Sequence, residues 1–177
     1  MKNLAIVYFS PNGTVKKCVE SIARGIEDTL TEEVSIEHIN ITKKENRNKE
    51  LEFYKDQLVI IGIPVYAGRV PNILIKYLRT FKGNDAMVFP IVVYGNRHYD
   101  DALVELGDIL EQCGFRVMGA CAAIGQHSFS STLGLNRPDE NDVNDLRGIG
   151  RRLYDNIISK NRFDIDNIPG NRPYRPY

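Results

Sequence analysis

Unbroken apolar runs alternate with helical patterns along most of the chain. Residues 4–9, 58–63, 86–94 and 116–124 are runs of strand length in which apolar residues follow one another without alternation. Such runs are typical of parallel strands that are covered on both faces. Residues 34–40 alternate more and include Glu37, which indicates an edge strand. The sequence therefore predicts five strands, one of them at an edge of the sheet.

Between these strands, apolar residues recur three or four positions apart, which is the spacing of one face of a helix. This spacing predicts helices over residues 15–26, 73–81, 103–113 and 143–157. The flanking residues fit these helices. Pro71 suits the first turn of the second helix, Gly114 suits the end of the third, and Asp139 and Asp142 suit the start of the fourth. Strands that alternate with helices define an α/β fold with a mostly parallel sheet.

Two segments show neither pattern. Residues 42–56 are highly charged, and we interpret them as an exposed connection with at most a turn of helix. Residues 168–177 contain three prolines, which exclude a regular helix or strand and predict an extended arm or a linker. We accordingly expect one domain, residues 1–165, followed by a proline-rich tail, residues 166–177.

Composition excludes several classes of protein. The chain has 23 Lys and Arg against 23 Asp and Glu, and so lacks the basic excess that nucleic-acid binding needs. It has neither a membrane-spanning run nor a signal peptide, which predicts a cytoplasmic protein without membrane association. The cysteines Cys18, Cys113 and Cys121 are scattered, which argues against a disulfide framework, a zinc site or a complete iron–sulfur cluster. We expect buried, reduced thiols.

Three loops leave the carboxyl ends of predicted strands, where ligands bind in open α/β sheets. The first, residues 10–14, reads Ser-Pro-Asn-Gly-Thr and precedes a helix. Free N–H groups and the helix dipole favour a phosphate at such a position. An ordinary turn with a Ser or Thr cap is the alternative for this loop by itself. The Walker pattern and Gly-x-Gly-x-x-Gly are both absent, and an acidic cluster typical of receiver domains is missing.

The second and third loops carry aromatic residues and glycines. Residues 64–71 read Pro-Val-Tyr-Ala-Gly-Arg-Val-Pro, and residues 94–100 read Tyr-Gly-Asn-Arg-His-Tyr-Asp. Either could be a surface loop when taken alone. Together with a phosphate loop at the same edge, they predict a site for a phosphorylated planar heterocycle.

At these residues the sequence resembles the flavodoxin family. Its phosphate loop, Ser/Thr-x-Thr-Gly-x-Thr, is similar to residues 10–15, although Asn12 replaces the usual threonine and Val15 the last one. Both changes remove a hydroxyl, so binding would depend more on backbone N–H groups, Ser10 and Thr14. The resemblance is greater still to flavodoxin domains that are fused to bacterial-type ferredoxins in anaerobic bacteria. It rests on residues 8–18, 62–71, 94–106, 114–129 and 137–142, and on a linker-like Pro-Gly-Asn-Arg-Pro-Tyr, but the ferredoxin cysteines are missing.

The resemblance implies a flavodoxin-like fold, a three-layer, doubly wound parallel sheet of five strands in the order 2-1-3-4-5, and FMN as cofactor. It assigns the FMN phosphate to Ser10, Asn12, Gly13, Thr14 and Val15. It assigns the isoalloxazine to a first group of residues, Pro64, Val65, Tyr66, Ala67 and Gly68, and to a second group, Tyr94, Gly95, Asn96, Arg97 and Tyr99.

Finer roles follow within this set. Tyr66 and Tyr99 are the candidates for stacking on the ring, and the peptide around Ala67 and Gly68 is the candidate partner of flavin N5. Gln126 and His127 follow the fourth apolar run, and His127 could line the approach to the flavin or be structural.

These expectations favour an FMN-binding carrier that passes electrons to or from a ferredoxin or another iron–sulfur protein, fused or separate. An NAD(P)H-dependent FMN oxidoreductase acting on quinones or flavins is one alternative. A binding module of the same fold without flavin is another. NAD(P)H consumption would favour the oxidoreductase, and failure to take up FMN would favour the binding module.

Overall fold

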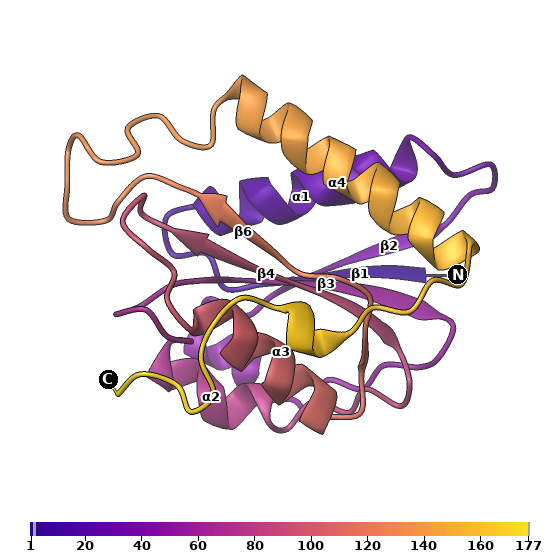
Figure 1. Ribbon diagram of the computed structural model, residues 1–177. Coiled ribbons are helices and arrows are strands. Elements are labelled where there is room, and N and C mark those ends of the chain that lie inside the picture. The colour runs from indigo at the N-terminus through magenta and orange to yellow at the C-terminus, as the bar shows by residue number, and fades with distance from the viewer. Residues whose placement is uncertain (2, 177) are drawn as a thin grey trace.

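A parallel sheet forms the middle layer of the molecule, and helices cover both of its faces (Figure 1). The computed structural model describes residue 1 and residues 3–176. The strands lie in the order β2-β1-β3-β4-β5, and β6 also pairs with β4. They are β1 (Asn3–Tyr8), β2 (Ser35–Asn40), β3 (Gln57–Pro64), β4 (Met87–Tyr94), β5 (Arg116–Val117) and β6 (Cys121–Ile124). This confirms the doubly wound order 2-1-3-4-5.

Four α-helices make up the outer layers, as the spacing predicted. They are α1 (Thr14–Glu27), α2 (Asn72–Leu78), α3 (Ala102–Gln112) and α4 (Glu140–Ile158), with 3₁₀ turns η1 (Lys44–Arg47) and η2 (Ile165–Asn167). Helices α1 and α4 lie side by side on one face, and α2 and α3 cover the other (Figure 1). Asp139 and Asp142 form a capping box at the start of α4, which confirms their predicted role. Within the described chain, each helix is too short or too polar to cross a membrane.

The inner strands supply two hydrophobic cores, one on each face of the sheet. Along β3, Leu58 and Ile60 point toward α1 and α4, whereas Val59 and Ile61 point toward α2 and α3. All four side chains are fully buried, and burial of one such side chain stabilises the fold by roughly 1.5–3 kcal/mol. Strand β2 is half exposed, which confirms its position at the edge.

Glycines bring α1 close to its neighbours. A Cβ at Gly62 in β3 would lie 2.3 Å from Val19 Cγ1, so the missing side chain lets α1 settle onto the sheet. A Cβ at Gly150 in α4 would lie 2.1 Å from the backbone oxygen of Ile22, and one at Gly25 would lie 2.0 Å from that of Arg147. The two helices therefore pack backbone against backbone, which fixes the position of α1.

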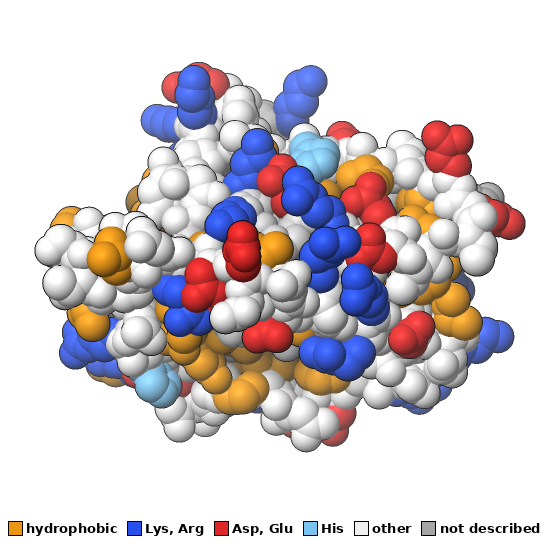
Figure 2. Space-filling model, turned by 90° about the horizontal axis from the view of Figure 1, so that it is seen from above, with side chains coloured by type: hydrophobic (Ala, Val, Ile, Leu, Met, Phe, Trp, Pro, Cys, Tyr) orange, Lys and Arg blue, Asp and Glu red, His pale blue; other side chains and the backbone are white. Residues whose placement is uncertain are grey.

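Charges of both signs are interspersed on the outer surface of this helical layer (Figure 2). Asp28 in α1 accepts hydrogen bonds from Arg147 at 2.9 Å and from Arg151 at 2.8 Å, both in α4. These bonds lower the pKa of Asp28. The face shown in Figure 2 therefore carries no large field of a single sign.

Two predictions about segments need correction. The run 116–124 is not one strand, because it is interrupted between β5 and β6, where Gly119 has a φ of 147°. Residues 42–56 do contain a helical turn, η1, but they are not wholly exposed. Phe53 is 2% exposed, and its ring lies 5.5 Å from that of Phe115. A phenylalanine among charges thus anchors this connection to the core.

The described part of the tail, residues 168–176, has no helix or strand, as predicted, but it lies against the domain. Ile168 is 3% exposed and belongs to the core on the α3 side. The segment then runs along α3 (yellow in Figure 1). Its role as a linker stays a prediction.

The three cysteines are free. Cys18 is buried, and Cys113 and Cys121 are half-buried. Burial raises the pKa of the Cys18 thiol and of the Cys121 thiol to about 12, so both are protonated at neutral pH. The expectation of buried thiols therefore holds fully for Cys18 and in part for Cys113 and Cys121.

Candidate functional site

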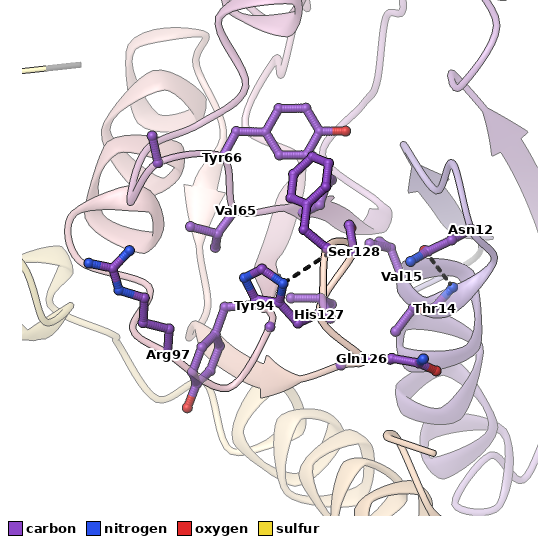
Figure 3. Close-up of a pocket in the computed structure, with 16 residues that line it drawn as sticks. Asn12, Thr14, Val15, Val65, Tyr66, Tyr94, Arg97, Gln126, His127 and Ser128 are labelled. Atoms are coloured by element: carbon purple, nitrogen blue, oxygen red, sulfur yellow. Dashed lines mark hydrogen bonds between the residues drawn. The ribbon is translucent and has the colours of Figure 1, made fainter. Parts of the chain in front are cut away.

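A cavity of about 580 Å³ opens at the carboxyl ends of β1, β3, β4 and β6 (Figure 3). The strands on either side of β1 are β2 and β3, so the sheet changes direction at this point. Ligands of open α/β sheets bind beside such a switch point, and the volume lies within the usual range of ligand pockets. All three predicted loops contribute to the wall, together with a fourth loop that follows β6.

The first loop, residues 9–13, joins β1 to α1 and is fixed at both ends. The backbone N–H of Ser10 donates to Thr42 Oγ1 at 2.9 Å, and Ser10 Oγ accepts from the backbone N–H of Lys16 at 3.0 Å. Asn12 Oδ1 accepts from the N–H of Thr14 at 3.3 Å (Figure 3). The N–H of Val15 has no hydrogen-bond partner among the described residues. An unpaired donor at the start of a fourteen-residue helix can bind an anion.

The second loop contains a tight turn at the cavity wall. Tyr66 and Arg69 exchange two backbone hydrogen bonds of 3.1 and 3.0 Å. The central residues Ala67 and Gly68 have φ values of 51° and 77°, as in a type I′ turn. The carbonyl of Gly68 accepts from the N–H of Asp101 at 3.0 Å, whereas the peptide between Ala67 and Gly68 has no hydrogen-bond partner in the described chain.

The third loop, residues 95–101, joins β4 to α3 and packs its own rings together. The ring of Tyr99 lies 5.4 Å from that of Tyr94 and is stacked 5.3 Å from that of His98. His98 Nδ1 accepts from the N–H of Asp100 at 2.8 Å. Tyr99 therefore packs within the loop and against the core, and Tyr94 is the ring that faces the cavity.

The fourth loop, residues 125–138, reaches over the cavity. Its base is closed by a hydrogen bond of 3.1 Å from the N–H of Gln126 to the carbonyl of Arg137. The side chain of His127 extends into the cavity between Tyr66 and Tyr94 (Figure 3). His127 Nδ1 accepts from the N–H of Phe129 at 3.1 Å, so in the neutral imidazole the proton is on Nε2.

Most of the predicted site residues meet at this cavity. Those that line it are Asn12, Thr14, Val15, Pro64, Val65, Tyr66, Ala67, Tyr94, Gly95 and Arg97. Among the described residues, Ser10, Gly13, Gly68, Asn96 and Tyr99 belong to the same loops without lining it. Beyond the assigned set, the cavity is also lined by Val93, Gly125, Gln126, His127, Ser128 and Phe129, of which the sequence had indicated only His127, as a residue that could line the approach to the flavin. The signal for this last group was the position of Gln126 and His127 directly after a strand.

The lining is apolar and carries positive rather than negative charge. Arg97 is the cationic side chain of the wall, and among the described residues no Asp or Glu lines the cavity. Tyr66 is 41% exposed at the rim, and Phe129 is 96% exposed beside it. Among the described residues, the site therefore combines flat apolar surface with a helix start that carries an unpaired N–H, and its wall holds no carboxylate. These features suit an aromatic ligand that carries a phosphate.

No model of a protein family matches the sequence, and no curated protein matches it. Solved structures do match. A flavodoxin from the domain Archaea is 16% identical, with a TM-score of 0.60 over 89% of this chain and 99% of its own. Rubredoxin oxygen:oxidoreductase from the anaerobe Desulfovibrio gigas is 16% identical, with a TM-score of 0.61 over 90% of this chain and 37% of its own. A flavone reductase is 12% identical, with a TM-score of 0.61 over 97% of this chain and 66% of its own. These likenesses show that the chain has a flavodoxin-like fold.

Proposed function

We propose that the chain is a cytoplasmic flavoprotein that binds FMN without a covalent bond and transfers electrons. The observation that carries this proposal is the cavity at which the start of α1, with an N–H that is unpaired among the described residues, meets two further loops. The flavodoxin-like fold supports it, because in that fold the same edge of the sheet is the place for a ligand. When bound, FMN would supply the redox chemistry, and the protein would supply position and electrostatics.

The residues at the start of α1 fit a phosphate group. Val15 offers an unpaired N–H in the described chain, and Asn12 and Thr14 line this end of the cavity. A Cβ at Gly125 would lie 2.5 Å from Thr14 Cγ2, so the glycine lets the fourth loop pass close to this wall. Gly13 has a φ of 83°, which most other residues rarely adopt, and the space beside it is open. We assign the phosphate to these groups, with Ser10 holding the loop.

The walls of the second and third loops fit a flat ring. Tyr66 and Val65 come from one loop and Tyr94 and Gly95 from the other, and all four line the cavity (Figure 3). Aromatic contacts contribute roughly 0.5–1.5 kcal/mol beyond burial. The unpaired peptide between Ala67 and Gly68 can present either its N–H or its C=O, which would let it follow a change of proton at a ring nitrogen.

A comparison of FMN with riboflavin tests the cofactor. We expect FMN to bind at least about 100-fold more tightly, since two charge-assisted hydrogen bonds to a phosphate contribute roughly 1.5–3 kcal/mol each. Riboflavin has the same ring without the phosphate and is the matched control. A purified protein that binds neither compound in an equilibrium titration would refute the proposal. Equal affinity for both would refute the role of the first loop.

We further propose that the electron partner is a ferredoxin or another iron–sulfur protein, fused or separate. The exposed aromatic rim at Tyr66 and Phe129 offers a docking surface beside the proposed flavin. Rapid reduction of the FMN-loaded protein by a reduced ferredoxin, followed by stopped-flow absorbance, would support this partner. Slow transfer at every ferredoxin concentration would argue against it.

One observation favours a second candidate, an NAD(P)H-dependent FMN oxidoreductase acting on quinones or flavins. A smaller cavity of about 240 Å³ adjoins the first and shares Tyr94, Arg97 and His127 with it. It could admit a substrate beside the ring, and a flavone reductase is among the proteins with this fold. Consumption of NADH or NADPH by the FMN-loaded protein, with a quinone or free flavin as acceptor, would support the enzyme over the carrier.

A further inference from the structure

The tail is anchored to a buried carboxylate at the start of α3. Asp101 is 1% exposed, and its backbone lies where the third loop becomes the helix. Its Oδ1 accepts from the backbone N–H of Asn171 at 2.8 Å and from Asn171 Nδ2 at 3.0 Å, and its Oδ2 accepts from the backbone N–H of Arg175 at 2.7 Å. Burial opposes ionisation of Asp101, but these donors outweigh it and hold its pKa below the usual value.

A second carboxylate, two turns further along α3, holds the middle of the tail. Asp108 accepts from Arg172 Nε at 2.9 Å and from Arg172 Nη2 at 2.6 Å, and it also accepts from the hydroxyl of Tyr174. Asp101 and Asp108 are seven residues apart, so both project from the same side of the helix. The tail therefore crosses α3 with a fixed register.

A buried ion pair joins the tail to the second loop. Arg69 donates to Glu105 through Nε at 2.8 Å and through Nη2 at 2.7 Å, and both residues are buried. The Nη1 of Arg69 donates to the carbonyl of Arg175, and its Cζ lies 4.9 Å from the centre of the Tyr174 ring. Arg69 closes the turn at the wall of the main cavity, so the tail contacts the residue that ends this turn.

The same residues hold the two loops of the proposed ring site to each other. The N–H of Asp101 donates to the carbonyl of Gly68 at 3.0 Å, and a Cβ at Gly68 would lie 2.3 Å from Asp100 Oδ2. Asp100 in turn forms an ion pair of 2.6 Å with Arg175 of the tail. The tail, the second loop and the third loop thus meet around one pair of aspartates.

We propose that the C-terminal tail is a positioning element of the cofactor site. Docked on Asp101 and Asp108, it fixes the turn at Gly68 and the third loop in the arrangement that brackets the ring. This inference rests on the proposed binding of FMN. It adds that the tail influences the affinity for the flavin ring although it lies outside the wall of the main cavity. Arg175 is the tail residue that lines the smaller cavity.

Coupling between tail docking and FMN binding is reciprocal. If the docked tail strengthens FMN binding by a given factor, bound FMN must strengthen tail docking by the same factor. The backbone N–H groups of Asn171 and Arg175 report on docking, because each donates to Asp101 and would exchange with solvent on release. The proposal can therefore be measured at the tail as well as at the flavin.

The test uses the full chain with the substitutions Arg172→Ala and Tyr174→Phe, which remove the donors to Asp108 and leave the cavity wall unchanged. Arg172→Ala alone is measured alongside as a milder change. Arg152→Ala is the matched control, because Arg152 is an exposed arginine on α4 without an ion pair in the described chain. Each protein is titrated with FMN, and amide hydrogen exchange is followed with and without FMN.

We expect the double variant to bind FMN about tenfold more weakly than the wild type, within the usual range of coupling between sites. The control should bind like the wild type, and Arg172→Lys should recover part of the loss. In the wild type, FMN should slow exchange at Asn171 and Arg175 by a comparable factor. Tight FMN binding by the double variant, although its Asn171 and Arg175 amides exchange faster than in the wild type, would overturn the inference and leave the proposed function intact. A wild type that binds no FMN would overturn both.

Discussion

The contact between α1 and α4 allows two neighbouring glycines to be compared on one helix. Gly148 and Gly150 both lie inside α4, where replacement by alanine raises helix propensity by about 1 kcal/mol. A Cβ at Gly148 would meet the flexible end of Arg152 at 3.4 Å, which is an ordinary contact. A Cβ at Gly150 would lie 2.1 Å from the backbone oxygen of Ile22 in α1. The same chemical change therefore has opposite consequences at two positions.

We expect Gly148→Ala to raise the free energy of unfolding by about 1 kcal/mol. Gly150→Ala gains the same propensity but forces two backbones apart, and such overpacking costs typically 1–3 kcal/mol. The gap of 2.1 Å is shorter than any ordinary contact with a backbone oxygen, so the cost should fall at the upper end of this range. We expect a net loss of about 1–2 kcal/mol.

Urea denaturation of the apoprotein, followed by far-UV circular dichroism, measures both values, and equal m-values would show that the comparison is valid. The reasoning also predicts weaker FMN binding by Gly150→Ala, because displacement of α1 moves the N–H of Val15. Stabilisation of both variants would refute the packing argument, since helix propensity alone would then explain the data.

Four further predictions concern the buried charges and the cavity. Glu105→Ala leaves the buried Arg69 without its carboxylate and should lower the free energy of unfolding by about 3–5 kcal/mol in urea denaturation. A loss below about 1 kcal/mol would contradict a strong ion pair between Arg69 and Glu105. His127→Ala removes a side chain that extends into the cavity and obstructs entry, so FMN should associate faster in stopped-flow fluorescence. An unchanged association rate would show that the fourth loop already moves freely. Arg97→Glu replaces a positive charge with a negative one, and each unit charge at ~10 Å and an effective dielectric of ~20 contributes about 1–2 kcal/mol, so the reversal should disfavour the reduced, anionic flavin by about 3 kcal/mol, seen as a lower potential in redox titration. Asp101 has a lowered pKa in the folded state, so its contribution to tail docking is complete above the unfolded value of about 3.9 and is lost as pH falls through the lower folded value; protection of the tail amides, taken relative to their intrinsic exchange rates, should be constant between pH 5 and 8, and a change there would contradict this.

The strands and the first loop could be predicted because their signals are local. Unbroken apolar runs mark the inner strands, and Asn12 and Gly13 before a helical pattern mark the first loop. The break in the run 116–124 was not predicted, because Met118 before Gly119 and Ala120 and Cys121 after it continue the apolar pattern. Whether Tyr99 or Tyr94 faces the cavity depends on how the rings of one loop pack, and neighbouring aromatic residues give no signal for this.

The positions of the fourth loop and of the tail were harder to predict, because they depend on contacts between distant parts of the chain. The tail left a trace in the sequence, however. Asp101, Glu105 and Asp108 form an acidic row along a helix that is otherwise mostly apolar, and Arg172 and Arg175 supply matching charges. An acidic row on a buried helix needs partners: Asp108 pairs with Arg172 of the tail, Glu105 pairs with Arg69 of the second loop, and Asp101 accepts from backbone N–H groups of the tail.

The interruption between β5 and β6 also affects how this sheet meets other molecules. A long, continuous outer strand exposes a row of unpaired N–H and C=O groups, which can recruit a strand from another chain and begin aggregation. Here the outer neighbours of β4 are segments of two and four residues, separated at Gly119. Neither segment is long enough to serve as a template, so the break protects this side of the sheet against edge-to-edge association.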